Sequence, residues 1–240
     1  MALIRQHDFH SKWRGAPIGI IESNDFFKLS NNEISTNLTK YLWVEFRVPS
    51  IFRSNQSVPK SLGFFLADTQ LKLSLNLRTL ESPGASDIQV ISASKSSFVI
   101  NKDDFLPFHA ERFLQIPGVT ESDITDRFQL WANMLIDQQP ESALRLVMNG
   151  KNQGWFFGTR NNKSLDLSVA MLARGATISG KSLYSVALDY FKKNGNHRAS
   201  GRFSSANFPV LNIFSERGAI FSSPLDIWIW LNPMHFKKSF

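Results

Sequence analysis

The sequence predicts an α/β protein built on a mixed sheet. A strand-like run at 165–173 precedes a loop of small residues at 174–180 and an amphipathic helix over about 181–193. A second strand pattern near 197–205 leads into a short helix after Asn207, a residue type that often caps helices. The first of these helices would begin directly after the loop with backbone amides that have no partner. Such free amides at a helix N-terminus bind anions.

The first hundred residues alternate short apolar runs with polar turns. Branched and aromatic residues predict a strand at 41–48, and leucines at every second position predict a half-buried strand at 69–77. A turn-rich stretch then opens a further strand at about 88–93. We expect residues 1–100 to form an N-terminal α/β domain and residues 101–240 to form a second domain.

The second part opens with a predicted helix. Thr120 and Asp123 have the spacing of a capping box, and apolar residues then recur at helical intervals. Asn149-Gly150 lies between two apolar runs and predicts a hairpin, whose turn ends at Gly150 or extends to Gly154. The last strand is expected at 225–231, where Ile and Leu alternate with Trp.

Composition excludes several classes of protein. The 240 residues are 42% hydrophobic and 20% charged, which is ordinary for a globular chain with a sizeable core. No apolar run approaches the ~20 residues that span a bilayer, and the N-terminus has no apolar signal core, so we expect a cytoplasmic protein without a membrane partner. There are no cysteines, and the five histidines lack metal-binding spacing, so we expect no metal.

The net charge of +7 is compatible with nucleic acid, a membrane surface or an anionic small molecule as partner. The lysines and arginines are spread along the chain rather than gathered in one tail or motif, so we expect no nucleic-acid partner. The densest basic cluster flanks one helix–strand turn and comprises Lys192, Lys193, His197, Arg198 and Arg202. Charge alone does not choose between a solvated basic surface and attraction of a polyanionic cofactor or nucleotide substrate.

The order and spacing of 165–218 resemble the acyl-CoA-binding half of the N-acetyltransferase (GNAT) superfamily. In this resemblance 175–180 takes the place of the pyrophosphate loop, and Asn207 that of the Asn on the second strand. The segments 111–113, 41–44 and 62–69 also resemble the dTDP-fucosamine type of sugar N-acetyltransferase. No single motif is exact.

The resemblance implies a GNAT acyl-CoA-binding fold with an additional N-terminal α/β domain. It implies an N-acyltransferase that uses acetyl-CoA as co-substrate, with a small amine acceptor, a nucleotide-linked amino sugar in surface polysaccharide assembly. An amino acid, a peptide terminus or another small amine remains an alternative acceptor, and a homodimer stays open. The implied cofactor-binding residues are Leu172, Ala173, Gly175, Ala176, Ile178, Ser179, Gly180, Lys181 and Asn207.

Two residues depart from the family pattern. Ile178 stands where a central glycine is usual, and Phe214 stands where many relatives carry a tyrosine that protonates the leaving thiolate. Ser205, its neighbour Ser204 or a water would then supply the proton. Asp166 and Ser168, expected on one strand face, are candidates for a water relay to the amine; the alternative is that they simply face solvent. For Asn207 the alternative is a plain N-cap.

Two other functional classes remain open. Without the tyrosine, the chain is also readable as a non-catalytic acyl-CoA-binding or scaffold module. A third reading is a basic nucleic-acid-associated protein without a cofactor, which steep salt dependence of DNA binding would identify.

Overall fold

The structure is a computed structural model that describes residues 3–50, 57–82 and 87–236. The strands are β1 (Ile4–Gln6), β2 (Ile18–Ile21), β3 (Trp43–Pro49), β4 (Phe65–Asn76), β5 (Gln89–Ser92), β6 (Ala143–Met148), β7 (Lys151–Asn161), β8 (Ser164–Leu172), β9 (Arg198–Ser204) and β10 (Ile220–Leu231). The helices are α1 (Asp8–Arg14), α2 (Asn31–Leu38), α3 (Ser57–Ser61), α4 (Glu121–Gln138), α5 (Gly180–Lys193) and α6 (Phe208–Ser215). Short 3-10 helices are η1 (Asn24–Lys28), η3 (Leu77–Thr79) and η4 (Arg112–Gln115).

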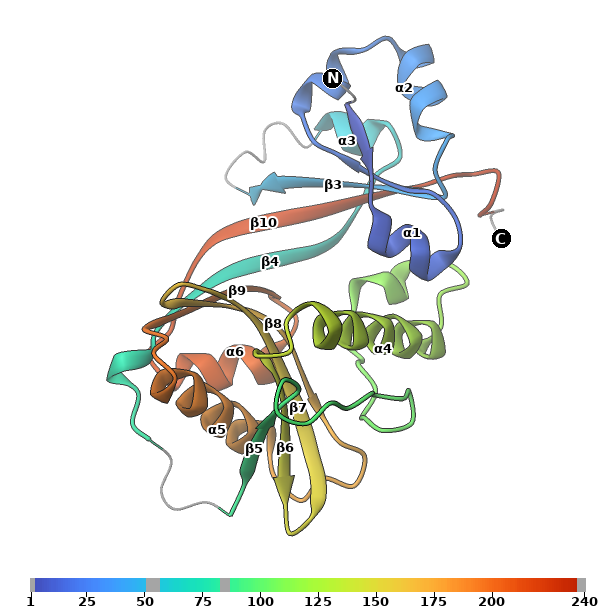
Figure 1. Ribbon diagram of the computed structural model, residues 1–240. Helices are drawn as coiled ribbons and strands as arrows, with labels where there is room; N and C mark the ends of the chain where they lie inside the picture. The colour runs from blue at the N-terminus through green and yellow to red at the C-terminus, as the bar shows by residue number, and fades with distance from the viewer. Residues whose placement is uncertain (1–2, 51–56, 83–86, 237–240) are drawn as a thin grey trace.

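The ten strands of the described chain form one mixed sheet in the order β1-β2-β3-β10-β4-β9-β8-β7-β6-β5 (Figure 1). β2 pairs with β3, and β8 with β9, in parallel; the other named pairs are antiparallel. β4 lies between β9 and β10. The expected boundary near residue 100 stays a prediction, and strands on either side of it are hydrogen-bonded to each other.

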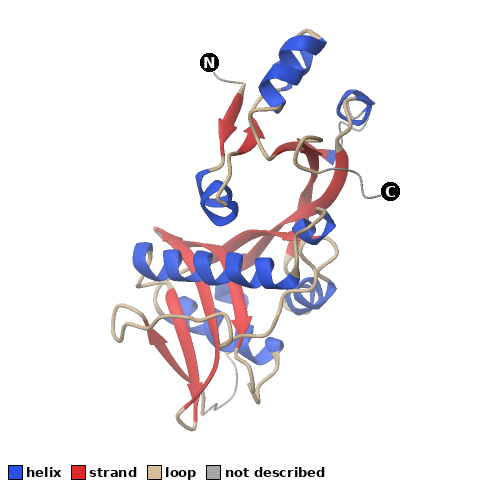
Figure 2. Cartoon of the chain, turned by 90° about the vertical axis from the view of Figure 1, so that its right-hand side faces the viewer, coloured by secondary structure: helices blue, strands red, loops and turns tan. Residues whose placement is uncertain are grey.

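Helices cover both faces of the lower part of the sheet. In Figure 1, α4 lies on one side of β7 and β8, and α5 and α6 lie on the other; Figure 2 shows α4 crossing the strands. Under α4, Ala132 and Ile136 join the core that contains Trp155 and Met171. Under α5 and α6, Phe191 and Phe214 belong to the core that contains β-strand residues Phe156 and Leu165. A third core fills the N-terminal part around Phe26 and Phe46.

The helix starts are set by local side chains, as the sequence predicts. The Thr120 amide donates to Asp123 Oδ2 (2.8 Å), and the Asp123 amide donates to Thr120 Oγ1 (3.2 Å), which completes the capping box of α4.

The hairpin turn between β6 and β7 is Asn149-Gly150, and both residues have positive φ. Gln153 is an extra residue in β7, since Leu146 pairs with Gly154 and Val147 with Asn152. No helix of the described residues is long and apolar enough to cross a membrane.

Candidate functional site

Two neighbouring parallel strands pair only at their beginnings. β8 and β9 are in register from Ser164/Arg198 to Asp166/Ser200, and β8 then continues to Leu172 without pairing to β9. Where the strands part, Gly158 of β7 pairs with Leu167 and Phe157 pairs with Val169, so Ser168 is an extra residue in β8. An extra residue bends its strand and increases its twist. The result is a gap between two strands at the centre of the sheet.

The irregularity at Ser168 also changes which side chains face which core. Before it, Leu165 and Leu167 pack into the core under α5; after it, Ala170 and Leu172 pack against that core. The strict alternation that would place Asp166 and Ser168 on one face therefore ends at Ser168. The shared-face expectation for these two residues rests on an alternation that the strand does not keep.

The loop that follows β8 is held by a local hydrogen bond and by a hydrogen bond to a side chain of the sheet. Gly175 has φ of 80°, a conformation that favours glycine. The Ala176 amide donates to the Ala173 carbonyl (3.1 Å), and the Thr177 amide donates to Oε1 of Gln153 (2.8 Å). Gln153 is itself buried, so the loop is attached to the sheet by a fixed side chain.

The loop ends at the N-terminus of α5, a helix of 14 residues. Ser179 is the N-cap, and its Oγ accepts a hydrogen bond from the Ser182 amide (3.1 Å). Within the described chain, the amides of Ile178, Gly180 and Lys181 donate to no protein acceptor. Free amides at a helix start carry partial positive charge, so this position suits a phosphate group.

The start of α5 is also tied to α6. Arg217 donates to the carbonyls of Ile213 (2.6 Å) and Lys181 (3.0 Å), and to the hydroxyl of Ser185. Lys181 Nζ lies 2.6 Å from Glu216 Oε2 in an exposed ion pair. These contacts fix the position of α6 beside the loop.

The backbone of Leu172 and Ala173 is already engaged within the protein. The Leu172 carbonyl accepts from the Leu106 amide (3.0 Å), and the Ala173 amide donates to the Gln153 carbonyl (3.0 Å). The segment around Phe105 thus pairs with the end of β8 on the edge away from β7. Along a strand, the backbone amides and carbonyls of every second residue point to the same edge. Those of Ala170 therefore point to the same edge as those of Leu172, which is the edge toward the gap. Ala170 is therefore a better placed contact for a ligand in the gap than Leu172 or Ala173.

The structure does not bring the three predicted catalytic residues together. Asp166 is exposed at the point where the strands part, and its Oδ1 accepts from Ser200 Oγ (3.3 Å). Ser205 follows the end of β9 and donates its amide to the Thr69 carbonyl (2.7 Å). It lies five residues beyond Ser200, roughly 16 Å along an extended strand. Its neighbour Ser204 donates to Asp68 Oδ1 (2.7 Å).

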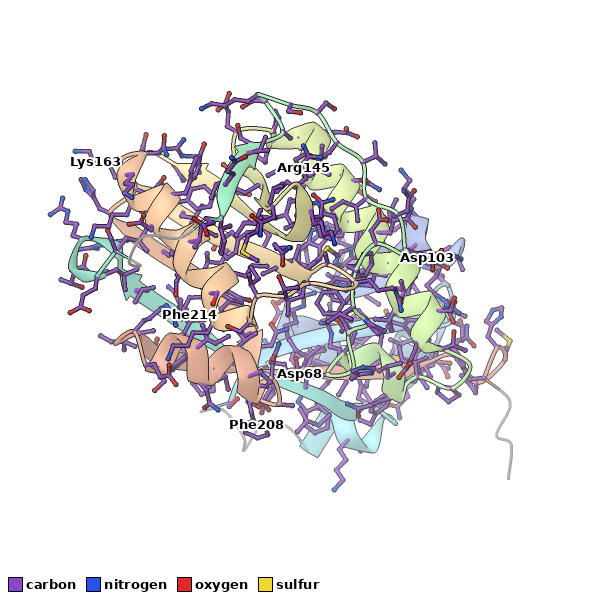
Figure 3. All side chains as sticks on the ribbon, turned by 90° about the horizontal axis from the view of Figure 1, so that it is seen from below. Asp68, Asp103, Arg145, Lys163, Phe208 and Phe214 are labelled. Atoms are coloured by element: carbon purple, nitrogen blue, oxygen red, sulfur yellow. The ribbon has the colours of Figure 1, made fainter. Side chains whose placement is uncertain are left out.

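Phe214 lies inside the core under α5 and α6. Its side chain is fully buried, and its ring centroid is 5.1 Å from that of Tyr184 and 5.4 Å from that of Phe203. Burial raises the pKa of Tyr184, so that phenol stays neutral. Asn207 is the N-cap of α6, with Oδ1 accepting from the Val210 amide (3.4 Å). Figure 3 shows Phe214 among the helices on this side of the sheet.

Sequence reasoning missed a buried ionic cluster under α1 and η4. Glu45 on β3 is fully buried and lies 3.2 Å from His10 Nδ1, 2.9 Å from Arg47 Nη2 and 3.5 Å from Arg112 Nη2. Burial alone would raise the pKa of Glu45, but Arg112, His10 and Arg47 outweigh it and hold that pKa well below its ordinary value. The signal in the sequence is a carboxylate and an arginine two residues apart, Glu45 and Arg47, inside an otherwise apolar strand run.

Burial keeps His10 neutral within this cluster. Burial lowers the pKa of His10 to about 3, against the opposing effect of Glu45. Arg127 Nη2 lies 3.4 Å from His10 Nε2, and Arg127 also pairs with Glu111 (3.3 Å). Since a guanidinium only donates, Nε2 accepts and Nδ1 carries the proton toward Glu45. Burial lowers the pKa of Arg127 to about 10.

Metal ligation is not visible in the described part of the chain, where no group of three or more His, Asp or Glu is placed to hold an ion. The candidate site is therefore the parting of β8 and β9 together with the N-terminus of α5, and the 104–106 segment pairs with β8 between them.

No family model and no curated protein sequence matches the chain. Solved structures are similar. A GCN5-related N-acetyltransferase from Sphaerobacter thermophilus has a TM-score of 0.52 at 12% identity over 79% of this chain, which spans only 60% of that chain. A conserved protein of unknown function from Staphylococcus epidermidis has a TM-score of 0.58 at 13% identity, over 90% of this chain and 85% of that one.

A tandem GNAT protein from the clavulanic acid biosynthesis pathway has a TM-score of 0.52 at 10% identity, over 91% of this chain and 76% of that one. At such identities the likeness concerns the fold. The expected fold class is confirmed: the chain has a mixed α/β GNAT fold with an additional N-terminal part.

Proposed function

We propose that the chain is an acyl-CoA-dependent N-acyltransferase that transfers acetyl from acetyl-CoA to an amine. The observation that carries this proposal is the parting of β8 from β9 beside the free amides at the start of α5, with the 104–106 segment paired to β8 between them. The similarity to solved GNAT folds supports it. We further propose a nucleotide-linked amino sugar of surface polysaccharide biosynthesis as the acceptor, on the basis of the sequence resemblance, and a cytoplasmic location, on the basis of the composition.

The chain's own groups are suited to positioning and to proton transfer. The amides of Ile178, Gly180 and Lys181 would hold the pyrophosphate of acetyl-CoA, and the backbone of Ala170 would hold its pantetheine arm in the gap. An amine attacks a thioester only when it is neutral, so a base must take its proton. Asp166, exposed where the strands part, is our candidate for that relay. Ser205 lies too far along β9 from Asp166 to reach the same thioester, so we propose a water as the donor to the leaving thiolate.

A calorimetric titration with acetyl-CoA at physiological salt tests the cofactor site. We expect one-to-one binding of acetyl-CoA with micromolar affinity, and absence of binding would refute the proposal. Release of CoA, followed with a thiol reagent in the presence of amino-sugar nucleotides, then tests transfer and the acceptor class.

One observation favours a second function, that of a non-catalytic acyl-CoA-binding module. Phe214 has no acidic proton, and its ring is fully buried between Tyr184 and Phe203. Binding of acetyl-CoA without CoA release for any amine tested would favour this module over the enzyme.

A further inference from the structure

A basic pocket lies at the far end of β8 from the loop 174–180. It has a volume of about 350 Å³ and is lined by Asn76, Arg78, Lys163, Ser164, His197 and Arg198. β8 is nine residues long, so the pocket and the loop are separated by roughly 27 Å along the strand. Figure 3 shows Lys163 at the periphery of the molecule, away from Phe214. The pocket is thus a different place from the proposed acyl-CoA site.

The cations of this pocket lack protein counter-ions. None of Arg78, Lys163 and Arg198 forms an ion pair with a residue in the described ranges, and no carboxylate lines the pocket. On the adjoining sheet surface, Arg202 of β9 stands directly opposite Lys72 of β4. Like charges directly opposite each other destabilise a sheet, and this pair adds to the positive potential beside the pocket. The nearest acid along β8 is Asp166, which accepts from Ser200.

His197 is held in one tautomer at the pocket. Arg78 Nη2 lies 2.6 Å from His197 Nδ1, and the guanidinium can only donate, so Nδ1 accepts and the proton sits on Nε2. The His197 amide donates to the Lys163 carbonyl (2.7 Å), and its carbonyl accepts from the Leu77 amide (2.9 Å), which fixes the backbone. Desolvation and the charges of Arg78 and Lys163 lower the pKa of His197. The imidazole therefore offers an N–H donor beside three cations.

We propose that this pocket binds a diphosphate group, free or as part of a nucleoside diphosphate. Arginine forks and lysine point charges are the usual phosphate ligands, and the pocket brings two arginines and one lysine together. No aromatic side chain other than His197 lines it, so it lacks the stacking platform that single-stranded nucleic acid uses. This site is independent of the proposed acyltransferase activity.

Titration calorimetry of the full chain with inorganic pyrophosphate, UDP and uridine tests the proposal. The variant Arg78→Gln/Arg198→Gln is expected to bind pyrophosphate about 10- to 100-fold more weakly, since it loses two charge-assisted contacts. Lys95→Gln/Lys151→Gln removes the same charge at exposed positions elsewhere and should bind within about twofold of the parent. Thermal unfolding of each variant checks that it is folded.

The three ligands separate the sources of the diphosphate. Tighter binding of UDP than of pyrophosphate identifies a nucleotide ligand, and equal binding identifies the phosphate groups alone; both support the proposal. Uridine binding as tightly as UDP would overturn it. So would absence of saturable pyrophosphate binding, or equal affinity in the double-arginine variant.

A local signal keeps this test separate from the acyl-CoA site. The ring nitrogen resonances of His197 should shift saturably with pyrophosphate, and should still do so in Gly180→Trp, a variant altered at the distant loop. Loss of that shift in Gly180→Trp would place the anion in the loop and refute a second site. Failure of acetyl-CoA to bind would leave the pocket proposal standing.

Discussion

The buried neutral imidazole of His10 makes the stability of the fold depend on pH. Its pKa is about 3 in the folded protein and 6.5 when unperturbed, and its side chain is only 3% exposed. Between those values the unfolded chain binds one more proton than the folded chain. The free energy of unfolding therefore has its full value above pH 6.5 and falls as the pH drops toward 3.

The magnitude follows from the gap between the two pKa values. Each pH unit in that window removes ~1.4 kcal/mol, so lowering the pH from 6.5 to 5 is expected to remove ~2 kcal/mol, and lowering it to 3 about 5 kcal/mol. His7 has a pKa lowered chiefly by burial and adds to the loss in the same direction. Glu45 has a depressed pKa, so its stabilisation is lost only at a lower pH, below ~4.5.

Urea unfolding at pH 7 and pH 5, followed by the fluorescence of the six tryptophans, measures this effect. In His10→Gln, the amide replaces the donor toward Glu45 but does not titrate, so most of the loss should disappear. His109→Gln is the matched control, because that ring is 71% exposed; it should keep the full loss. An unchanged loss in His10→Gln would refute the reasoning.

Three further substitutions test the loop and the core. Gly180→Trp is expected to abolish acetyl-CoA binding in the calorimeter, and normal binding by this variant would contradict the loop assignment. Gly180→Ala is the control and should bind normally, because its Cβ would lie at an ordinary contact distance of 3.6 Å from Ile213 Cδ1. Gly154→Ala would put a Cβ 2.3 Å from the Met171 carbonyl oxygen and should lower the unfolding free energy by about 1–3 kcal/mol or more, so an unchanged urea midpoint would count against it. Phe214→Tyr inserts a hydroxyl into a fully buried site and should cost about 1–3 kcal/mol in the same urea assay; unchanged stability would mean that the hydroxyl reaches water or a partner.

The local elements were predictable because their signals are local. The expected strand at 165–173 is β8, the helix over 181–193 is α5, and the strand near 197–205 is β9. Asn207 caps α6 with its own side chain, three residues from the amide it serves. Caps and periodicity act over a few neighbours and can be read from the sequence.

Contacts between distant segments could not be read in this way. The Leu172 carbonyl is occupied by Leu106, which lies 66 residues earlier and has no pattern that marks it as a strand partner. Glu45 was missed as part of an ionic cluster because two of its three partners, His10 and Arg112, come from α1 and η4. The extra residue at Ser168 depends on how β8 pairs with β7. Register and long-range pairing set the details of the candidate site.

The place of β4 between β9 and β10 has a consequence for how the chain folds. β4 is made early in synthesis, but both of its hydrogen-bonded neighbours lie more than 120 residues later. A fragment that begins at residue 101 would leave β9 and β10 with unpaired edges facing each other, the condition that promotes aggregation. Sheets that pair strands distant in the sequence fold slowly. We therefore expect β4 to gain its hydrogen-bonded neighbours only after the last strand, β10, has been made.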